Sequence, residues 1–219
     1  MEPINTHLSE VANRFSDRRV QLFDVKASSL AGKRLLLQGR VLDQTTLQAL
    51  QHSFEERLPE LVVDYSQIRI LRPMDPCLLQ VATNLTSVHA EPSWLAEMLS
   101  QCTFGTSLEI LAEQDGWVFV RQVDGYLGWM YRPYLTDHPT PAPTYIVASP
   151  LTEIHAESDP KSPLRSRLVG GTLVQVVSTR SAWAEIDANT WGWAQLTDLR
   201  ALDNLPTSLD MRRKAIVND

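Results

Sequence analysis

The chain has 219 residues, of which 43% are hydrophobic, and a formal net charge of −6 at neutral pH. This length allows one large domain or two to three small ones. The mild acidity argues against binding to the phosphates of a nucleic acid, because such binding needs a basic surface. The sequence also lacks an apolar run of the roughly eighteen residues that a membrane-spanning helix requires.

The first residues and the cysteine and histidine content argue against further classes of function. The start of the chain lacks the basic and apolar regions of a secretory signal, so we expect a cytoplasmic protein if Met1 is the native start. Cys77 and Cys102 form neither a disulfide framework nor a CxxC pair. The five histidines lack the spacing of a metal-binding pair. We therefore expect no metal, no cofactor, and neither a nucleic acid nor a membrane as a partner.

Residues 1–72 predict a small α+β domain. Apolar residues at helical spacing predict a first helix, capped near its start by Asn5 or Thr6; they are Ile4, Leu8, Val11, Ala12 and Phe15. Residues 20–25 and 33–42 are predicted to be strands. Gly39 within the second of them indicates a bulge or the close approach of another backbone.

Asp43 is predicted to cap a second helix, because a side-chain oxygen at this position can accept a hydrogen bond from the first turn. The helix should end at Pro59, and its apolar stripe is Leu47, Leu50, Phe54 and Leu58. Residues 61–63 and 68–71 predict further strand. The order α-β-β-α-β indicates a sheet with helices on one face. In order alone it is similar to small BON-type domains, and a turn-rich linker follows at residues 72–76.

The remainder of the chain contains an internal duplication. The stretch Leu85–Glu91 reappears as Leu151–Glu157, 66 residues later, and the same offset relates two tryptophans. A two-residue deletion brings a second tryptophan pair into register. The sequence therefore predicts two copies of one small module, at residues 78–136 and 145–201, separated by a proline-rich spacer.

Both copies carry the pattern of short β-strands. Apolar stretches follow glycine turns at matched places: 107–111, 117–120 and from 128 in the first copy, and 173–177, 183–186 and from 192 in the second. Several short strands at regular spacing predict a small barrel or sandwich. A unit of this size has a marginal core, so large aromatic side chains in each copy have a structural reason.

The motif Gly-Trp-Val-Phe-Val, followed by Gly-Tyr-Leu-Gly-Trp-Met, resembles bacterial SH3-like (SH3b) domains. The blocks Glu91-Pro92-Ser93, Ala96–Gln101 and Phe104-Gly105 are similar to the SH3-like domain of NlpC-type γ-D-glutamyl-L-diamino acid endopeptidases, also called dipeptidyl-peptidase VI. These are papain-like cysteine peptidases that cleave murein-derived peptides. The resemblance implies a mainly β fold, with two tandem small SH3-like β-barrels preceded by the small α+β domain.

The catalytic blocks of that family do not occur in this sequence. A papain-like peptidase needs a nucleophilic cysteine activated by histidine, and neither an Asp-Cys-Ser-Gly-like nor a Tyr-Leu-Trp-Gly-Gly-like block is present. Cys77 and Cys102 are both expected to be buried, inert thiols. Residues 202–219 are predicted to form a tail with the start of a helix, similar to the helix that leads into the family's catalytic domain. We assign no catalytic residue, and whether the chain is itself an enzyme stays open.

The two copies allow an internal comparison. Residues at the same place in both copies are expected to serve the fold; they are His89/His155, Glu91/Glu157, Trp117/Trp183 and Trp129/Trp193. Residues of one copy alone are better functional candidates. In the first copy these are Trp94, Glu97 and Tyr126.

The resemblance implies roles for these residues. In the family, an acidic residue and a tyrosine of the first SH3-like domain hold the free amine of the substrate's L-alanine, and Glu97 and Tyr126 are the matching candidates. An ammonium has three donors and suits such acceptors. Trp94, together with Tyr131, is a candidate aromatic wall for the ligand. Alternatively, Glu97 is a solvated turn residue, Tyr126 a half-buried barrel residue and Trp94 part of the edge of the core.

These observations lead to two hypotheses. In the first, the chain is the non-catalytic substrate-recognition and scaffolding region of a bacterial cell-wall peptide endopeptidase. Its first barrel would grip the N-terminal end of an L-Ala-γ-D-Glu peptide, and a papain-like catalytic domain would be its partner if the chain is truncated. In the second, it is a stand-alone SH3-like module that binds cell wall or protein.

Overall fold

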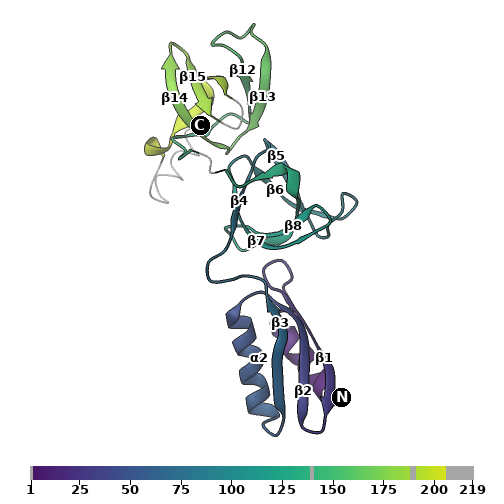
Figure 1. Cartoon of the computed structure of the whole chain (residues 1–219). Coiled ribbons are helices and arrows are strands. Elements are labelled where there is room, and N and C mark those ends of the chain that lie inside the picture. The colour runs from purple at the N-terminus through teal and green to yellow at the C-terminus, as the bar shows by residue number, and fades with distance from the viewer. Residues whose placement is uncertain (1, 139–140, 188–190, 206–219) are drawn as a thin grey trace. The chain divides into compact units, whose positions relative to one another are not determined.

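The computed structural model describes residues 2–138, 141–187 and 191–205. It contains a three-stranded sheet and two seven-stranded sheets, which confirms the predicted mainly β fold with a small α+β part at the start (Figure 1). One compact unit combines residues up to 78 with 89–97 and 108–132, and the other combines 79–88, 98–107 and the described residues from 133 onward. This division passes through the first seven-stranded sheet, so the three domain boundaries stay a prediction.

The N-terminal elements follow the predicted order. They are α1 (Glu2–Arg14), β1 (Phe23–Ala31), β2 (Arg34–Val41), α2 (Gln44–Arg57) and β3 (Val62–Ile70). Strands β1 and β2 are antiparallel, whereas β2 and β3 are parallel. Because parallel neighbours need a crossover connection, α2 lies between them in the chain and runs along the sheet in Figure 1.

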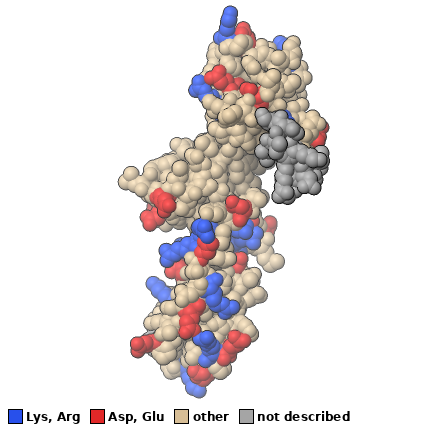
Figure 2. All heavy atoms as spheres, turned by 180° about the vertical axis from the view of Figure 1, so that it is seen from behind, with Lys and Arg blue, Asp and Glu red and all other residues tan. Residues whose placement is uncertain are grey.

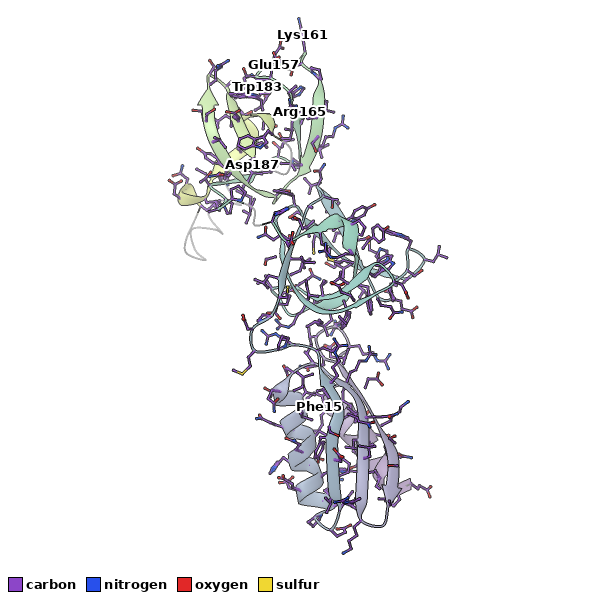
Figure 3. All side chains as sticks on the ribbon, viewed as in Figure 1. Phe15, Glu157, Lys161, Arg165, Trp183 and Asp187 are labelled. Carbon is purple, nitrogen blue, oxygen red and sulfur yellow. The ribbon has the colours of Figure 1, made fainter. Side chains whose placement is uncertain are left out.

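Both helices pack on one face of this sheet. Leu35 and Leu37 of β2 are fully buried and point to the same side, since side chains alternate along a strand. They share one core cluster with buried residues of α1 and α2, namely Ile4, Leu8, Val11, Leu50 and Phe54. Phe15, labelled in Figure 3, packs against this cluster and stacks on Phe23, with ring centroids 5.7 Å apart.

The first helix begins earlier than predicted. Its first residue is Glu2, so Asn5 and Thr6 lie inside the helix and the predicted cap is wrong. The Thr6 hydroxyl donates to the carbonyl of Glu2 at 3.1 Å, and Ser9 bonds Asn5 in the same way. Such bonds to the preceding turn let polar residues occupy a helix interior. The predicted cap of the second helix is confirmed, because Asp43 accepts from the Thr46 amide at 2.9 Å.

Two strand predictions also change. The first strand begins at Phe23 rather than at residue 20. The two stretches predicted after α2 form the single strand β3, which is bulged: Leu36 and Gln38 pair with Asp64 and Gln67, so an extra residue interrupts the alternation on β3. In the sequence, this break in the alternation of apolar residues resembles a gap between two strands. The sequence pattern alone therefore suggests two segments.

The two copies have the same strand order. The first sheet runs β10-β4-β7-β8-β9-β5-β6, and the second runs β17-β11-β14-β15-β16-β12-β13, which is the same order element for element. The first copy comprises β4 (Leu78–Val81), β5 (Leu85–His89), β6 (Met98–Thr103), β7 (Ser107–Gln114), β8 (Trp117–Arg121), β9 (Leu127–Tyr131), η1 (Arg132–Tyr134) and β10 (Leu135–Thr136). The second comprises β11 (Tyr145–Val147), β12 (Leu151–His155), β13 (Leu164–Val169), β14 (Leu173–Arg180), β15 (Trp183–Asp187), β16 (Gly192–Gln195), η2 (Leu196–Asp198), β17 (Leu199–Ala201) and η3 (Leu202–Asn204).

The match between the copies extends to backbone detail. Asp115 and Ser181, at equivalent turns, both have φ of 51°, a left-handed conformation that is uncommon outside glycine. The β7–β8 and β14–β15 pairs carry a register shift at the same place. The predicted strands of both copies are therefore confirmed, and the two copies share backbone conformation as well as sequence.

The cysteines differ from one another in burial. Cys102 on β6 is buried, as predicted, whereas Cys77 is exposed, so its predicted burial is wrong. Cys77 precedes β4, outside the inward-facing positions Leu79 and Val81. The predicted C-terminal helix from residue 208 lies outside the described residues. Within the described part of the chain, no helix is long and apolar enough to cross a membrane.

Surface charge is mixed in sign over the N-terminal domain. On the face drawn in Figure 2, Lys and Arg alternate with Asp and Glu and do not gather into a patch of one sign. Opposite charges are paired at several places, for example between Arg40 and Asp24 at 3.1 Å. On this face, charges of opposite sign therefore largely offset one another.

Candidate binding site

Four rings gather at one place in the first copy. His89 ends β5, Trp117 begins β8, Tyr131 ends β9, and Trp94 lies on the loop between β5 and β6. Trp117 and Tyr131 are direct partners in the β8–β9 pairing. Trp94 lies 4.8 Å from Trp117, 5.2 Å from Tyr131 and 5.7 Å from His89, measured between ring centroids. These spacings fall within the range of favourable aromatic pairs. We call this group the aromatic cluster.

The aromatic cluster is buried at its base and open at its top. Trp117 and His89 are only 6% and 5% exposed, whereas Trp94 is 51% exposed. Trp94 therefore rests on a buried aromatic layer and keeps about half of its surface in contact with solvent. The predicted pairing of Trp94 with Tyr131 is present as a ring contact. An exposed aromatic side chain on a rigid base provides apolar area for a ligand with little loss of conformational entropy.

The base of the cluster is repeated in the second copy. His89 meets Trp117 edge-on at 5.5 Å and 84°, and His155 meets Trp183 at 5.6 Å and 84°. In both copies the histidine Nδ1 lies 3.2 Å from the carbonyl seven residues further along the chain. These matched contacts support the structural role predicted for the histidine pair.

The upper layer of the cluster is found in the first copy alone. At the positions of Trp94 and Tyr131, the second copy has Pro160 and Gln195, and at the position of Glu97 it has Pro163. Figure 3 shows Glu157 and Lys161 at the corresponding loop of the second copy, with Trp183 on β15 below them. The Trp94–Tyr131 pair and the acid at position 97 thus have no counterparts at the matched positions of the second copy.

The loop that carries Trp94 also carries Glu97. The Ala90 amide donates to the Glu97 carbonyl at 2.9 Å, so the two ends of the loop are tied together. Within it, the amides of Leu95 and Ala96 donate to the hydroxyl and the carbonyl of Ser93. The Glu97 residue is exposed, directly before β6. A short, internally bonded loop therefore presents Trp94 and Glu97 to solvent together.

Tyr126 lies at a different place. It is half-buried and directly precedes β9, and its amide donates to Asp124 at 3.0 Å. The carboxylate of Asp17 and, after it, the Tyr126 phenol raise the pKa of Arg19 above its usual value. Tyr126 directly precedes β9 and Tyr131 ends it, and five residues of extended strand span about 17 Å. The structure groups Trp94 with Tyr131 and places Tyr126 at the opposite end of β9; the binding roles of Trp94, Glu97 and Tyr126 stay predictions.

A charged group next to this copy was not anticipated from the sequence. Glu109 on β7 accepts from Arg72 Nε at 2.6 Å and Nη2 at 2.9 Å, and from Arg121 at 3.5 Å. The hydrogen bond from Arg72 is the main cause that lowers the pKa of Glu109. Arg72 belongs to the predicted linker, where no pattern indicates a partner. No group of three acidic, histidine or cysteine side chains able to hold a metal occurs in the described residues.

Comparisons with known proteins point to one domain family. Residues 88–132 match the family model described as the bacterial dipeptidyl-peptidase Sh3 domain. This segment contains the whole aromatic cluster together with Glu97 and Tyr126. No curated protein matches the chain.

Similar solved structures include an NlpC/P60 family protein from Bacillus cereus, with 13% identity and a TM-score of 0.51 over 64% of this chain and 61% of that one. NlpC2 from Trichomonas vaginalis gives 14% identity and a TM-score of 0.27, covering 66% and 56%. The CBD of the endolysin LysPBC5 gives 10% identity and a TM-score of 0.23, covering 60% and 98%. The chain thus spans less than two thirds of the Bacillus cereus protein.

At 13% identity, the Bacillus cereus structure supports the fold and no more. The family model adds a sequence match over the segment that carries the aromatic cluster. The resemblance predicted from the sequence is therefore confirmed: this chain has an SH3-like fold, similar at residues 88–132 to the SH3 domain of bacterial dipeptidyl-peptidases and in architecture to an NlpC/P60 family protein.

Proposed function

We propose that this chain is a cell-wall-related binding module. Its first SH3-like copy binds the N-terminal end of a murein-derived peptide. One observation carries the proposal: Trp94, 51% exposed on a buried aromatic base, lies within the residues that match a dipeptidyl-peptidase SH3 domain. The second copy lacks this upper layer and serves as structural support.

The chemistry of the loop suits such a ligand. The carboxylate of Glu97 offers strong acceptors to a peptide ammonium, which has three donors. Trp94 and Tyr131 offer an apolar surface to the alanine methyl and the peptide backbone. Peptide cleavage would belong to a papain-like catalytic domain that acts with this module, and no residue of the present chain is assigned to that step.

Titration with an L-Ala-γ-D-Glu peptide, followed by NMR chemical shifts, tests the proposal. We expect Trp94→Ala to weaken binding about tenfold, because a stacked aromatic ring contributes about 0.5–1.5 kcal/mol beyond its buried area. Trp191→Ala is the matched control, since Trp191 is also 51% exposed but belongs to the second copy. Equal losses in the two variants, or no binding by the unaltered chain, would contradict the proposal.

A protein partner is the second candidate. Next to Trp94, Leu95 is 98% exposed and Met98 is 54% exposed, and contiguous exposed apolar side chains often mark protein-interaction surfaces. Leu95→Ser separates the two functions. A peptide site centred on Trp94 and Glu97 should keep its affinity in this variant, whereas a protein interface at the loop tip should lose it.

A further inference from the structure

A segment of the N-terminal domain contacts the turn that carries Tyr126. The amide of Leu127, the first residue of β9, donates to the carbonyl of Arg19 at 2.7 Å. At the tip of the turn, Gly125 faces Val20, because a Cβ on Gly125 would lie 3.8 Å from the Val20 side chain. The Tyr126 phenol also contributes, after the Asp17 carboxylate, to raising the pKa of Arg19. Residues on both sides of Tyr126 are therefore in contact with residues 19 and 20.

The contacting segment is itself held in one conformation. The Asp17 carboxylate accepts from the Arg19 amide at 3.1 Å and from Arg19 Nε and Nη2 at 2.8 Å each. The Asp17 carbonyl accepts from the amides of Val20 and Gln21 at 3.1 and 2.9 Å. A bidentate pair of this kind fixes the orientation of a guanidinium. The carbonyl and the side chain of Arg19 are thus both oriented before any ligand binds.

Apolar packing keeps the two parts in contact. Leu42 and Leu71 of the N-terminal domain form one core cluster with Leu111 and Leu127 of the first copy, and all four are at most 4% exposed. Beside this cluster, Arg72 makes its two bonds to Glu109. Buried apolar area therefore supports the link between Arg19 and the Tyr126 turn in addition to its hydrogen bonds.

We propose that Arg19, held by Asp17, is a positioning residue that fixes the Tyr126 turn of the first SH3-like copy from within the N-terminal domain. The N-terminal domain then forms part of the binding unit and determines where the Tyr126 phenol lies. This inference rests on the proposed function for its effect on affinity, whereas its structural part stands on the contacts of Leu127, Gly125 and Arg19.

Amide hydrogen exchange of Leu127 in the full chain tests the structural part. We expect Asp17→Ala to accelerate exchange of this amide about tenfold, the equivalent of one hydrogen bond, while the Val118 amide on β8 keeps its protection. Arg18→Ala is the matched control, because Arg18 is an adjacent exposed arginine. Unchanged Leu127 exchange in Asp17→Ala would overturn the proposal.

Affinity for the L-Ala-γ-D-Glu peptide tests whether positioning matters for binding. We expect Arg19→Ala to weaken binding about two- to tenfold, Arg19→Lys to restore part of the loss, and Arg18→Ala to have no effect. In a Tyr126→Phe background the Arg19→Ala loss should largely disappear, because the two residues act through one phenol. An undiminished loss in that background would refute action through Tyr126. Absence of peptide binding by the unaltered chain would refute the proposed function, and Leu127 exchange would still decide the positioning.

Discussion

Trp94 and Trp117 are neighbours in one aromatic cluster, yet their exposed fractions are 51% and 6%. Trp117 has a counterpart in Trp183 of the second copy, whereas Trp94 has none. The shared pairs His89/His155 and Trp117/Trp183 make the same edge-on ring contact in both copies, whereas Trp94 lies above this contact in the first copy and is half exposed. Comparison of two copies within one chain therefore separates structural aromatics from candidate binding residues.

Glu97 supplies a charge-based prediction. If its carboxylate meets the peptide ammonium, Glu97→Gln should weaken binding of a free-amine peptide about three- to tenfold and leave an N-acetylated peptide unaffected. Isothermal titration of the two peptides measures both effects. The control is Glu157→Gln, an exposed acid on the matched loop of the second copy. A loss of equal size for both peptides would argue against an ammonium contact.

His7 on α1 gives a prediction of pH dependence. It is 6% exposed, lies 2.7 Å from the Ser53 hydroxyl through Nε2 and packs edge-on against Phe54. Burial, and after it the charge of Arg57, lower the pKa of His7 below 6.5. Just below pH 6.5 the unfolded chain therefore binds more protons than the folded chain, so stability is full above this pH and falls as the pH drops through the folded-state pKa.

Thermal unfolding at pH 7.5 and pH 5.5 measures this effect. The loss of stability on acidification should be smaller in His7→Gln, which removes the titrating group, than in the unaltered chain. His52→Gln is the control, because the His52 side chain is 71% exposed. The prediction is wrong if the two variants respond equally to acid.

At the scale of the elements, local interactions decided most boundaries. Asp43 capped α2 as expected because its partner, the Thr46 amide, is three residues away. Two predictions were wrong: α1 begins at Glu2, before the predicted cap, and β3 is one continuous strand where two were predicted. The break in alternation near Ser66 is a bulge against β2, and a partner strand distant in sequence is needed to distinguish a bulge from a strand end.

Gly39 of β2 gives a stability prediction at this scale. Its φ is +142°, and a Cβ would lie 1.9 Å from the Asp24 carbonyl oxygen of the neighbouring strand. Gly39→Ala should therefore lower the free energy of unfolding by about 3 kcal/mol or more, through both strain and overlap with backbone. Gly32→Ala is the control, since its φ is +61° but nothing lies within 4 Å of its Cβ position. Its cost should be about 1 kcal/mol, and urea unfolding compares the two.

At the scale of the whole molecule, the two seven-stranded sheets share one strand order, and the N-terminal domain is linked to the first of them. Glu109 is central to that link, since its side chain is 19% exposed and meets both Arg72 and Arg121. Removal of one partner from a largely buried charged group leaves the others without compensation.

Glu109→Ala should therefore lower the free energy of unfolding by about 1–3 kcal/mol. Glu113→Ala, an exposed acid on the same strand, should change it by less than about 0.5 kcal/mol. Because the pKa of Glu109 is lowered from 4.5, its contribution is present above that pH and is lost as the pH falls through the folded-state value. Denaturant curves at pH 7 and near pH 3 measure both effects, and a difference between variants that persisted undiminished in acid would contradict the electrostatic cause.

The α-β-β-α-β order and the duplication could be predicted from the sequence, and the motifs of the first copy added the resemblance to SH3-like domains. The order of elements and the duplication follow from spacing along the chain, which a sequence shows directly. Tertiary packing was needed to show that Trp94 rests on Trp117 and Tyr131, that the Leu127 amide meets the Arg19 carbonyl, and that Arg72 pairs with Glu109. Each of these contacts joins residues brought together by sheet pairing or by packing between elements, and periodicity carries no information about which distant side chains will meet.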